Sequence, residues 1–195
     1  MSREQAEDYE DKKRGIMDAA ATLFANVGYP NAQLTEVAKA CGATKSMLYH
    51  YFKAKDELLF AILSDHLQRT ITALQAIDPK LAPEARFRRL IEAYIHQSTE
   101  SRTSHVVAMN DVKFLSGDAR ARIVELERKI FQLVEQSLMD LAPKLSRKLV
   151  GPYAMTLLGM MSWTDFWYRK SGPLKPGELC DHIAQLFLHG FYERS

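Results

Sequence analysis

The stretch from Leu34 to Phe52, LTEVAKACGATKSMLYHYF, constrains the fold more than any other part of the chain. Val37 and Ala38 give a first short helix an apolar stripe, and Gly42 allows a tight left-handed turn after it. Thr44 is a good N-cap for a second helix. Two short helices joined in this way are typical of a helix-turn-helix, whose second helix enters the DNA major groove while the first lies across the backbone.

The residues that follow make this pattern more specific. The whole block resembles the signature of the TetR family of transcriptional repressors, which is close to I-A-x-x-x-G-V-S-x-x-x-L-Y-x-Y-F-x-x-K-x-x-L. The residues that match it in register are Val37, Ala38, Gly42, Ala43, Thr44, Leu48, Tyr49, Tyr51, Phe52, Lys55 and Leu58. The resemblance implies an all-α fold of about nine helices, with an N-terminal three-helix DNA-binding domain and a C-terminal helical domain that binds a ligand and forms a dimer.

Apolar periodicity predicts helices along the rest of the chain. One is expected from about Tyr9 to Asn26, and a longer one from about Lys55 to Leu74, which would leave the small first domain and enter the next. Beyond residue 83 only helical periods occur, with breaks at Ser116-Gly117, Ala142-Pro143, Gly151-Pro152 and Gly172-Pro173. The predicted organisation is a DNA-binding domain at residues 1–55, with residues 1–8 disordered, and a ligand-binding and dimerisation domain at residues 56–195.

Positive charge is concentrated in the first of these domains. The formal net charge is only +2, but residues 12–55 carry seven bases and two acids, whereas residues 1–11 carry one base and five acids. A basic segment that coincides with a helix-turn-helix is the electrostatic pattern expected for phosphate binding. Lys12, Lys13 and Arg14 either contact the DNA backbone or form a solvated basic run.

The sequence also argues against several other classes of protein. The acidic start does not resemble a secretory signal, and no run of about 18 apolar residues could span a bilayer. Cys41 and Cys180 form no CxxC pair, so we expect reduced thiols in a cytoplasmic protein. The motifs G-x-S-x-G and H-E-x-x-H are absent, and the six histidines lack metal-ligand spacing. We therefore expect neither an enzyme nor a protein with a cofactor, a metal ion or a membrane partner.

The two short helices offer side chains for DNA contact. We predict the DNA-binding residues Thr35, Thr44, Lys45, Ser46, Tyr49, His50 and Lys55. The hydroxyl, imidazole and ammonium groups among them can donate to phosphate oxygens, which position a protein without reading sequence. Lys45 and Ser46 lie at the start of the second helix, where they can reach base edges. Thr35 could also cap the first helix in place of Gln33, which is a poorer cap, and Tyr51 belongs either to the core or to the contact surface.

A second segment resembles a subgroup of the same family. The run LLGMMSWTDFWY at residues 157–168, followed by Gly172, is similar to L-x-G-x-x-N-W-x-x-x-W-x-x-x-x-G, with Ser162 in place of the usual Asn. Many regulators of that subgroup respond to coenzyme A thioesters from fatty-acid, sterol or aromatic-acid breakdown. The surroundings of Tyr49 and His66 also resemble regulators of phenylacetate degradation.

An acyl or aryl ligand would need an apolar pocket, and its phosphates would need cations. The predicted pocket residues are Tyr94, Met109, Phe114, Phe131, Trp163, Phe166 and Trp167. The available cations are Arg86, Arg88, Arg89, Arg102, Arg120, Arg122 and Arg128, because the planar guanidinium suits phosphate. The simpler interpretation of these aromatic residues is the core, and that of the arginines is solvated surface.

Two subunits are expected on both structural and DNA-binding grounds. In the TetR family the last two helices of each subunit pair as a four-helix bundle, which implies the interface residues Leu157, Met161, Thr164, Leu179, Ile183, Leu186, Phe187 and Gly190. One short recognition helix buries too little surface for operator affinity, whereas a two-fold dimer reads two half-sites.

The resulting prediction is a homodimeric repressor that leaves its operator, a double-stranded DNA site, when it binds a small-molecule inducer. The expected inducer is an acyl- or aryl-coenzyme A. Two alternatives stay open at this point. One is a multidrug-sensing repressor of an efflux pump, with an aromatic and acidic pocket. The other is an architectural DNA-binding protein without a ligand, which would lack a cavity and show little operator preference.

Overall fold

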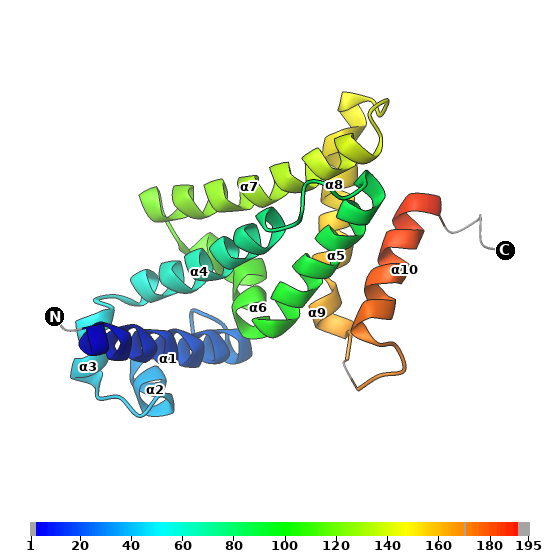
Figure 1. Ribbon diagram of the computed structural model, residues 1–195. Helices are drawn as coiled ribbons and strands as arrows, with labels where there is room; N and C mark the ends of the chain where they lie inside the picture. Colours follow the sequence, from blue (N-terminus) through cyan, green and yellow to red (C-terminus); the bar gives the residue numbers. More distant parts are fainter. Residues whose placement is uncertain (1–2, 170, 191–195) are drawn as a thin grey trace. The chain divides into compact units, whose positions relative to one another are not determined.

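The computed structural model describes residues 3–169 and 171–190, and the regular structure of these residues is entirely helical (Figure 1). The elements are α1 (Arg3–Val27), α2 (Leu34–Ala40), α3 (Lys45–Tyr51), α4 (Lys55–Gln75), α5 (Pro83–Glu100), α6 (Arg102–Asp111), the 3-10 helix η1 (Val112–Phe114), α7 (Gly117–Leu141), α8 (Arg147–Ser162), α9 (Thr164–Trp167) and α10 (Pro176–His189). Only Trp163 separates the single turn α9 from α8. The predicted all-α fold of about nine helices is therefore confirmed.

The described residues divide into two compact units. Unit 1 contains residues 3–66 and 101–124, and unit 2 contains residues 67–100, 125–169 and 171–190. Helices α4 and α7 each contribute residues to both units. The expected domain at residues 1–55 did not include residues 101–124, which pack with the N-terminal helices. Whether residues 1–55 fold as a separate domain stays a prediction.

Unit 1 is organised around the apolar face of α1. Ile16, Ala20 and Phe24 recur at four-residue steps on this helix and are at most 1% exposed. Helix α1 contacts α2 on one side and α6 on another. The buried Val37 of α2 and Leu48 of α3 complete the interior of this unit.

A left-handed glycine makes the turn between α2 and α3. Gly42 has φ +66°, a conformation that L-residues with a side chain rarely adopt. The backbone N–H of Ala43 donates to the carbonyl of Ala38 at 2.8 Å, which closes the end of α2. The turn was predicted at this residue, and its geometry is that of the expected helix-turn-helix.

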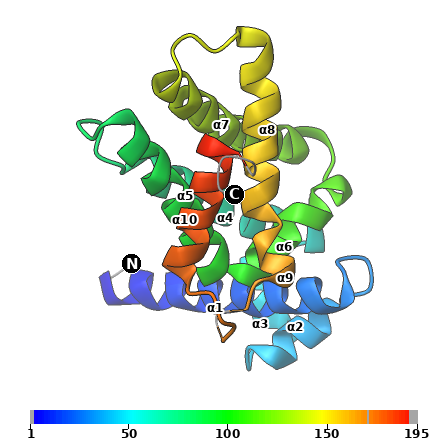
Figure 2. The same cartoon turned by 90° about the vertical axis from the view of Figure 1, so that its right-hand side faces the viewer.

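Unit 2 is a packed group of long helices. Helix α5 contacts both α8 and α10, and Figure 2 shows α10 alongside α5. The fully buried Phe87 and Ile91 of α5 and Ala154 and Leu157 of α8 are part of its core. No helix among the described residues is long and apolar enough to cross a membrane.

Two predicted helix boundaries were wrong. Helix α1 begins at Arg3 instead of Tyr9, and an ion pair of 2.6 Å between Asp8 and Lys12 lies within its first turns. Met1 and Ser2 lie outside the described residues. Helix α8 begins at Arg147 and runs through the expected break at Gly151-Pro152, so Pro152 lies inside the helix, where its ring leaves one backbone hydrogen bond unmade.

We predict opposite effects for two glycine-to-alanine substitutions. Gly42→Ala should lower the free energy of unfolding by about 1 kcal/mol, because φ is positive there. Gly15→Ala should leave stability unchanged or raise it, because Gly15 lies within α1 and a methyl group would meet no atom within 4 Å. Urea unfolding followed by circular dichroism measures both. Equal effects would contradict the assigned turn geometry.

Candidate nucleic-acid interface and ligand-binding region

Helix α3 is fixed at both ends and along one face. At its start the Thr44 hydroxyl oxygen accepts a hydrogen bond from the backbone N–H of Met47 at 3.1 Å, as predicted for an N-cap. At its end the N–H of Phe52 donates to the carbonyl of Leu48 at 2.9 Å. Leu48 and Phe52 are at most 2% exposed. The burial of these two side chains decides which residues of α3 face solvent.

The opposite face of α3 carries the predicted DNA-binding side chains. Lys45, Ser46, Tyr49 and His50 are exposed, and the Nζ of Lys45 lies 5.8 Å from the centre of the Tyr49 ring. Because these residues lie within two turns of one helix, their donors form one contiguous polar surface. Such a surface can donate to phosphates and base edges together.

Thr35 is exposed on α2, but it does not cap that helix. The N-cap is Gln33, whose backbone N–H donates to the Glu36 carboxylate at 3.2 Å. A carboxylate three residues into the helix thus supplies the reciprocal half of a capping box. The expectation that Thr35 replaces Gln33 as the cap was wrong, whereas its contact with DNA stays a prediction.

Lys55, another predicted DNA-binding residue, makes two contacts inside the protein. Its ammonium donates to the carbonyl oxygen of Pro30 at 3.2 Å and lies 4.5 Å from the centre of the Tyr29 ring. Desolvation lowers the pKa of Lys55, and the Asp111 carboxylate opposes this effect. Lys55 therefore holds the loop after α1 against the start of α4. Its contact with phosphate stays a prediction.

Sequence reasoning missed an aromatic cluster behind α3. Tyr9 on α1 packs against Tyr51, with ring centres 4.6 Å apart, and its ring meets His50 edge-on at 6.4 Å. Tyr51 is half-buried by this contact. The cluster connects the first turns of α1 to the last turn of α3. The periodicity of α1 places Tyr9 on the same face as Ile16, seven residues further on, but it could not show that Tyr51 packs there.

Two further contacts connect residues 101–124 to other parts of unit 1. The ring nitrogens of the buried His66 on α4 and His105 on α6 share a hydrogen bond of 3.1 Å. Phe114 of η1 stacks on Tyr29, with ring centres 5.3 Å apart and an angle of 27° between the planes. Phe114 is thus a packing partner of the loop that precedes the helix-turn-helix.

A buried carboxyl group lies at the end of α6. Asp111 is 5% exposed, and desolvation raises its pKa, while the Lys113 and Lys55 ammonium groups oppose the rise. Burial also raises the pKa of Tyr29, with further contributions from Asp56 and Asp111. The charges of Lys55 and Asp111 therefore partly compensate each other in this region.

In unit 2 the predicted pocket residue Tyr94 lies in a buried polar contact. The Tyr94 and Ser162 hydroxyl groups are 2.7 Å apart, and the two residues are 8% and 6% exposed. Desolvation raises the pKa of Tyr94, whereas the hydrogen bond between Tyr94 and Ser162 lowers it. Ser162 stands where the subgroup pattern has Asn, so a small hydroxyl replaces a larger amide beside a buried phenol.

The other predicted pocket residues are distributed over both units. Met109 and Phe114 belong to unit 1 and are 45% and 39% exposed. In unit 2, Trp163 stacks on Phe166 with ring centres 4.4 Å apart, and Trp163 and Trp167 are more than half exposed. Phe131 and Phe166 are half-buried. Their role as a ligand pocket stays a prediction.

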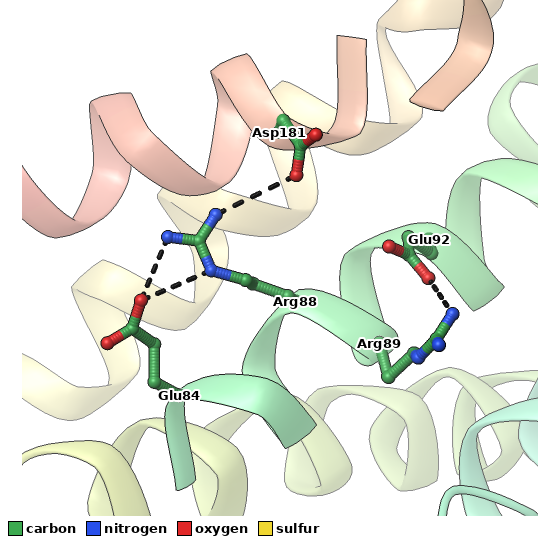
Figure 3. Close-up of polar contacts among 5 residues, drawn as sticks. All are labelled: Glu84, Arg88, Arg89, Glu92 and Asp181. Carbon is green, nitrogen blue, oxygen red and sulfur yellow. Dashed lines mark hydrogen bonds and ion pairs between the residues drawn. The ribbon is translucent and has the colours of Figure 1, made fainter. Parts of the chain in front are cut away.

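Most of the arginines considered for phosphate binding already have intramolecular partners. Arg86 pairs with Asp140 at 2.9 Å, and Arg128 pairs with Glu125 at 2.7 Å. Figure 3 shows Arg88 extending from α5 toward Asp181 on α10 while it also binds Glu84. Arg122 lies 5.1 Å from the Phe60 ring centre. A phosphate would have to compete with these contacts.

The residues predicted for the dimer interface divide into two groups by burial. The side chains with less than 8% exposure within one chain are Leu157, Met161, Thr164, Leu179 and Ile183. A side chain covered by its own unit offers little surface to a second subunit, so these five belong to the core of unit 2. Leu186 and Gly190 are exposed and Phe187 is half-buried, so these three stay candidates.

Exposed apolar side chains occur instead on another face of the α8–α9 segment. Met155, Trp163 and Trp167 are 61%, 58% and 54% exposed. The exposed Gly159 lies between Met155 and Trp163 at four-residue spacing, which places these positions along one side of the helix. Apolar residues occur on both sides of α8, so periodicity alone could not decide which side is covered within the chain.

A helix-turn-helix with a buried inner face and a basic, hydroxyl-rich outer face defines a DNA-binding transcriptional regulator. Residues 16–62 match the family described as "Bacterial regulatory proteins, tetR family", and residues 80–191 match "Tetracyclin repressor-like, C-terminal domain". The second match alone covers more than half of the chain. The chain therefore belongs to the TetR family.

Individual relatives agree with this assignment. The chain is 26% identical to the HTH-type transcriptional regulator HbdR of Aromatoleum sp. (strain CIB) over 66% of its own length, but it spans only 57% of that relative. It resembles the crystal structure of a TetR-family regulator from Bordetella parapertussis 12822 with a TM-score of 0.89, 29% identity and coverage of 94% and 97% of the two chains. The crystal structure of AibR in complex with isovaleryl coenzyme A and operator DNA is similar with a TM-score of 0.77, 26% identity and coverage of 90% and 97%.

We predict that Lys45→Ala weakens binding to a 20-base-pair duplex and lowers the slope of log affinity against log salt by about one, because the loss of one cation at the DNA surface reduces the number of counterions released on binding. Fluorescence anisotropy at several salt concentrations measures both quantities. The control is Lys129→Ala, which removes an exposed lysine from α7. An unchanged salt slope in Lys45→Ala would remove Lys45 from the interface.

Proposed function

We propose that this protein is a homodimeric transcriptional repressor that leaves its operator when a coenzyme A thioester binds. The DNA-binding part of this proposal is supported by α3, which has one buried face and one exposed polar face. Leu48 and Phe52 fill the core, and Lys45, Ser46 and Tyr49 are presented to solvent. A major groove accepts a helix with this arrangement.

Dimerisation is supported by the exposed apolar side of α8–α9. Met155, Trp163 and Trp167 together present more apolar surface than isolated surface residues usually do. Leu186, 42% exposed, adds a further apolar side chain on α10. We propose that a second copy covers these side chains, and that the two α3 helices then contact successive turns of the DNA, roughly 34 Å apart.

The ligand class is supported by resemblance and by one crystal structure. AibR, similar over 90% of this chain, was crystallised with isovaleryl coenzyme A and operator DNA. The segment from Leu157 to Gly172 also matches the pattern of a thioester-responsive subgroup. Within unit 2, the buried hydroxyl pair of Tyr94 and Ser162 could orient a polar thioester beside apolar side chains.

Release from DNA requires a ligand that favours one conformation over another. Residues of α4 and α7 occur in both units, so a ligand that changes unit 2 acts on helices shared with unit 1. A ligand with a differential affinity of about 1 to 3 kcal/mol between the two states would lower DNA affinity about five- to 150-fold.

The dimer proposal predicts different outcomes for two matched methionine substitutions. Met155→Arg should give a monomer in sedimentation velocity, because a charge replaces an apolar side chain in the proposed interface. Met139→Arg should leave the dimer intact, because Met139 is exposed on α7, a helix that contributes no residue to the proposed interface. A dimer in both variants, or a monomeric wild type, would contradict the proposed interface.

The ligand proposal predicts that isovaleryl- or phenylacetyl-coenzyme A displaces labelled promoter DNA, whereas the corresponding free acids do not. Fluorescence anisotropy with a panel of thioesters, free acids and antibiotics measures the displacement. Release by lipophilic drugs alone would instead favour a multidrug sensor. DNA binding with little sequence preference that none of these compounds affects would favour an architectural protein.

A further inference from the structure

The first turns of α1 lie beside the end of α3 (Figure 1). Three rings meet there. The ring centre of Tyr9 on α1 is 4.6 Å from that of Tyr51 and 6.4 Å from that of His50. His50 and Tyr51 are neighbours in the sequence, and their ring centres are 5.5 Å apart. The aromatic cluster therefore combines one ring from α1 with two consecutive rings from the last turn of α3.

The imidazole of His50 is nearly perpendicular to both tyrosine rings. The angle between the ring planes is 84° with Tyr9 and 86° with Tyr51. Edge-to-face arrangements are favourable between aromatic rings, because the positive edge of one ring meets the negative face of the other. His50 is nevertheless exposed, whereas both tyrosines are half-buried. The two tyrosines therefore restrict the orientation of the imidazole without removing it from solvent.

Burial in the core does not orient the His50 ring. Leu48 and Phe52 anchor α3 to the interior of unit 1, but His50 lies on the exposed side of this helix. Exposed side chains change rotamer rapidly, on timescales of picoseconds to nanoseconds. Tyr51 is the last residue of α3, so His50 also lies in a turn whose carbonyl groups lack partners within the helix. Ring contacts with a second helix are therefore needed to hold the imidazole in one orientation.

The position of Tyr9 depends on the first turns of α1. Asp8 and Lys12 form an ion pair of 2.6 Å across the turn that contains Tyr9, and pairs with this spacing favour the helical backbone. The hydrogen bond and the charge of Asp8 raise the pKa of Lys12, and Tyr51 adds a smaller increase. Lys12 thus lies near the Tyr51 phenol as well, so two consecutive turns of α1 face the end of α3.

We propose that Tyr9 is a positioning residue of the DNA interface, which holds the His50 imidazole in the orientation that meets a phosphate oxygen of the operator. This inference rests on the proposed DNA-binding role of α3. A side chain that is oriented before binding loses less conformational entropy when the complex forms. Tyr9 therefore contributes to DNA affinity through His50, and not through a contact of its own with DNA.

Two substitutions of Tyr9 separate the effect of the ring from that of the hydroxyl group. Tyr9→Ala should weaken binding to labelled promoter DNA about three- to tenfold, because the His50 ring is no longer oriented before binding. The slope of log affinity against log salt should not change, because no charge is lost. Tyr9→Phe keeps the ring contacts and should bind as the wild type does. Fluorescence anisotropy measures these quantities. Unchanged affinity in Tyr9→Ala, or equal weakening by both substitutions, would overturn the proposal.

A double-mutant cycle tests whether Tyr9 acts through His50. In the His50→Ala background, Tyr9→Ala should weaken DNA binding no further, because the side chain that it orients is absent. Additive losses would show that Tyr9 acts independently of His50 and would overturn the proposal. The control is Tyr153→Ala on α8, which removes a ring that meets Phe187 at 6.3 Å and 84°, nearly the geometry of Tyr9 and His50. A loss of DNA affinity in this control equal to that in Tyr9→Ala would also overturn the proposal.

A measurement without DNA separates this proposal from the proposed function. The aromatic ring of Tyr9 shifts the NMR resonances of the His50 imidazole protons in the free protein. Tyr9→Ala should therefore move these resonances, whereas Tyr153→Ala should not. Resonances that do not move in Tyr9→Ala would overturn the proposal even if the wild type binds DNA. A wild type that binds no promoter DNA would contradict the proposed function, and with it the role of the aromatic cluster in DNA contact, even if the resonances move.

Discussion

The packing of α2 and α3 against α1 is the interaction on which the DNA-binding surface depends. Helices α2 and α3 have seven residues each, and helices of this length are not stable in water on their own. They persist because Val37 and Leu48 are completely buried with Phe24 of α1 in the interior of unit 1. The buried side chains of α2 and α3 therefore determine which residues of α3 face solvent.

Contacts from residues far along the chain extend this arrangement. Helix α6 contacts α1, the His66–His105 hydrogen bond connects α6 to α4, and Phe114 stacks on Tyr29. These contacts place residues 101–124 in the same unit as the helix-turn-helix. Packed contacts of this kind are one route by which a change in one part of a protein affects another part.

The features that sequence reasoning predicted correctly depend on neighbouring residues. Gly42 adopts a positive φ and Thr44 accepts a backbone hydrogen bond, and each follows from the local chemistry of a turn or a cap. The features that it missed depend on residues distant in the chain. Tyr9 meets Tyr51, and Lys55 meets Pro30, across 42 and 25 positions respectively. Periodicity also could not show which side of α8 is buried within the chain, because Leu157 and Met155 are both apolar. In the folded chain Leu157 is buried and Met155 is exposed.

The two cysteines differ in burial, and this difference decides which of them reacts with thiol reagents. With a pKa of about 11, Cys180 has roughly one thiolate in a thousand at pH 8, and the thiolate is the form that oxidants and alkylating reagents attack. Cys41 follows the last residue of α2 and is partly exposed. A maleimide dye would therefore attach mainly beside the helix-turn-helix, which turns a natural residue into a reporter of DNA contact without any engineered cysteine.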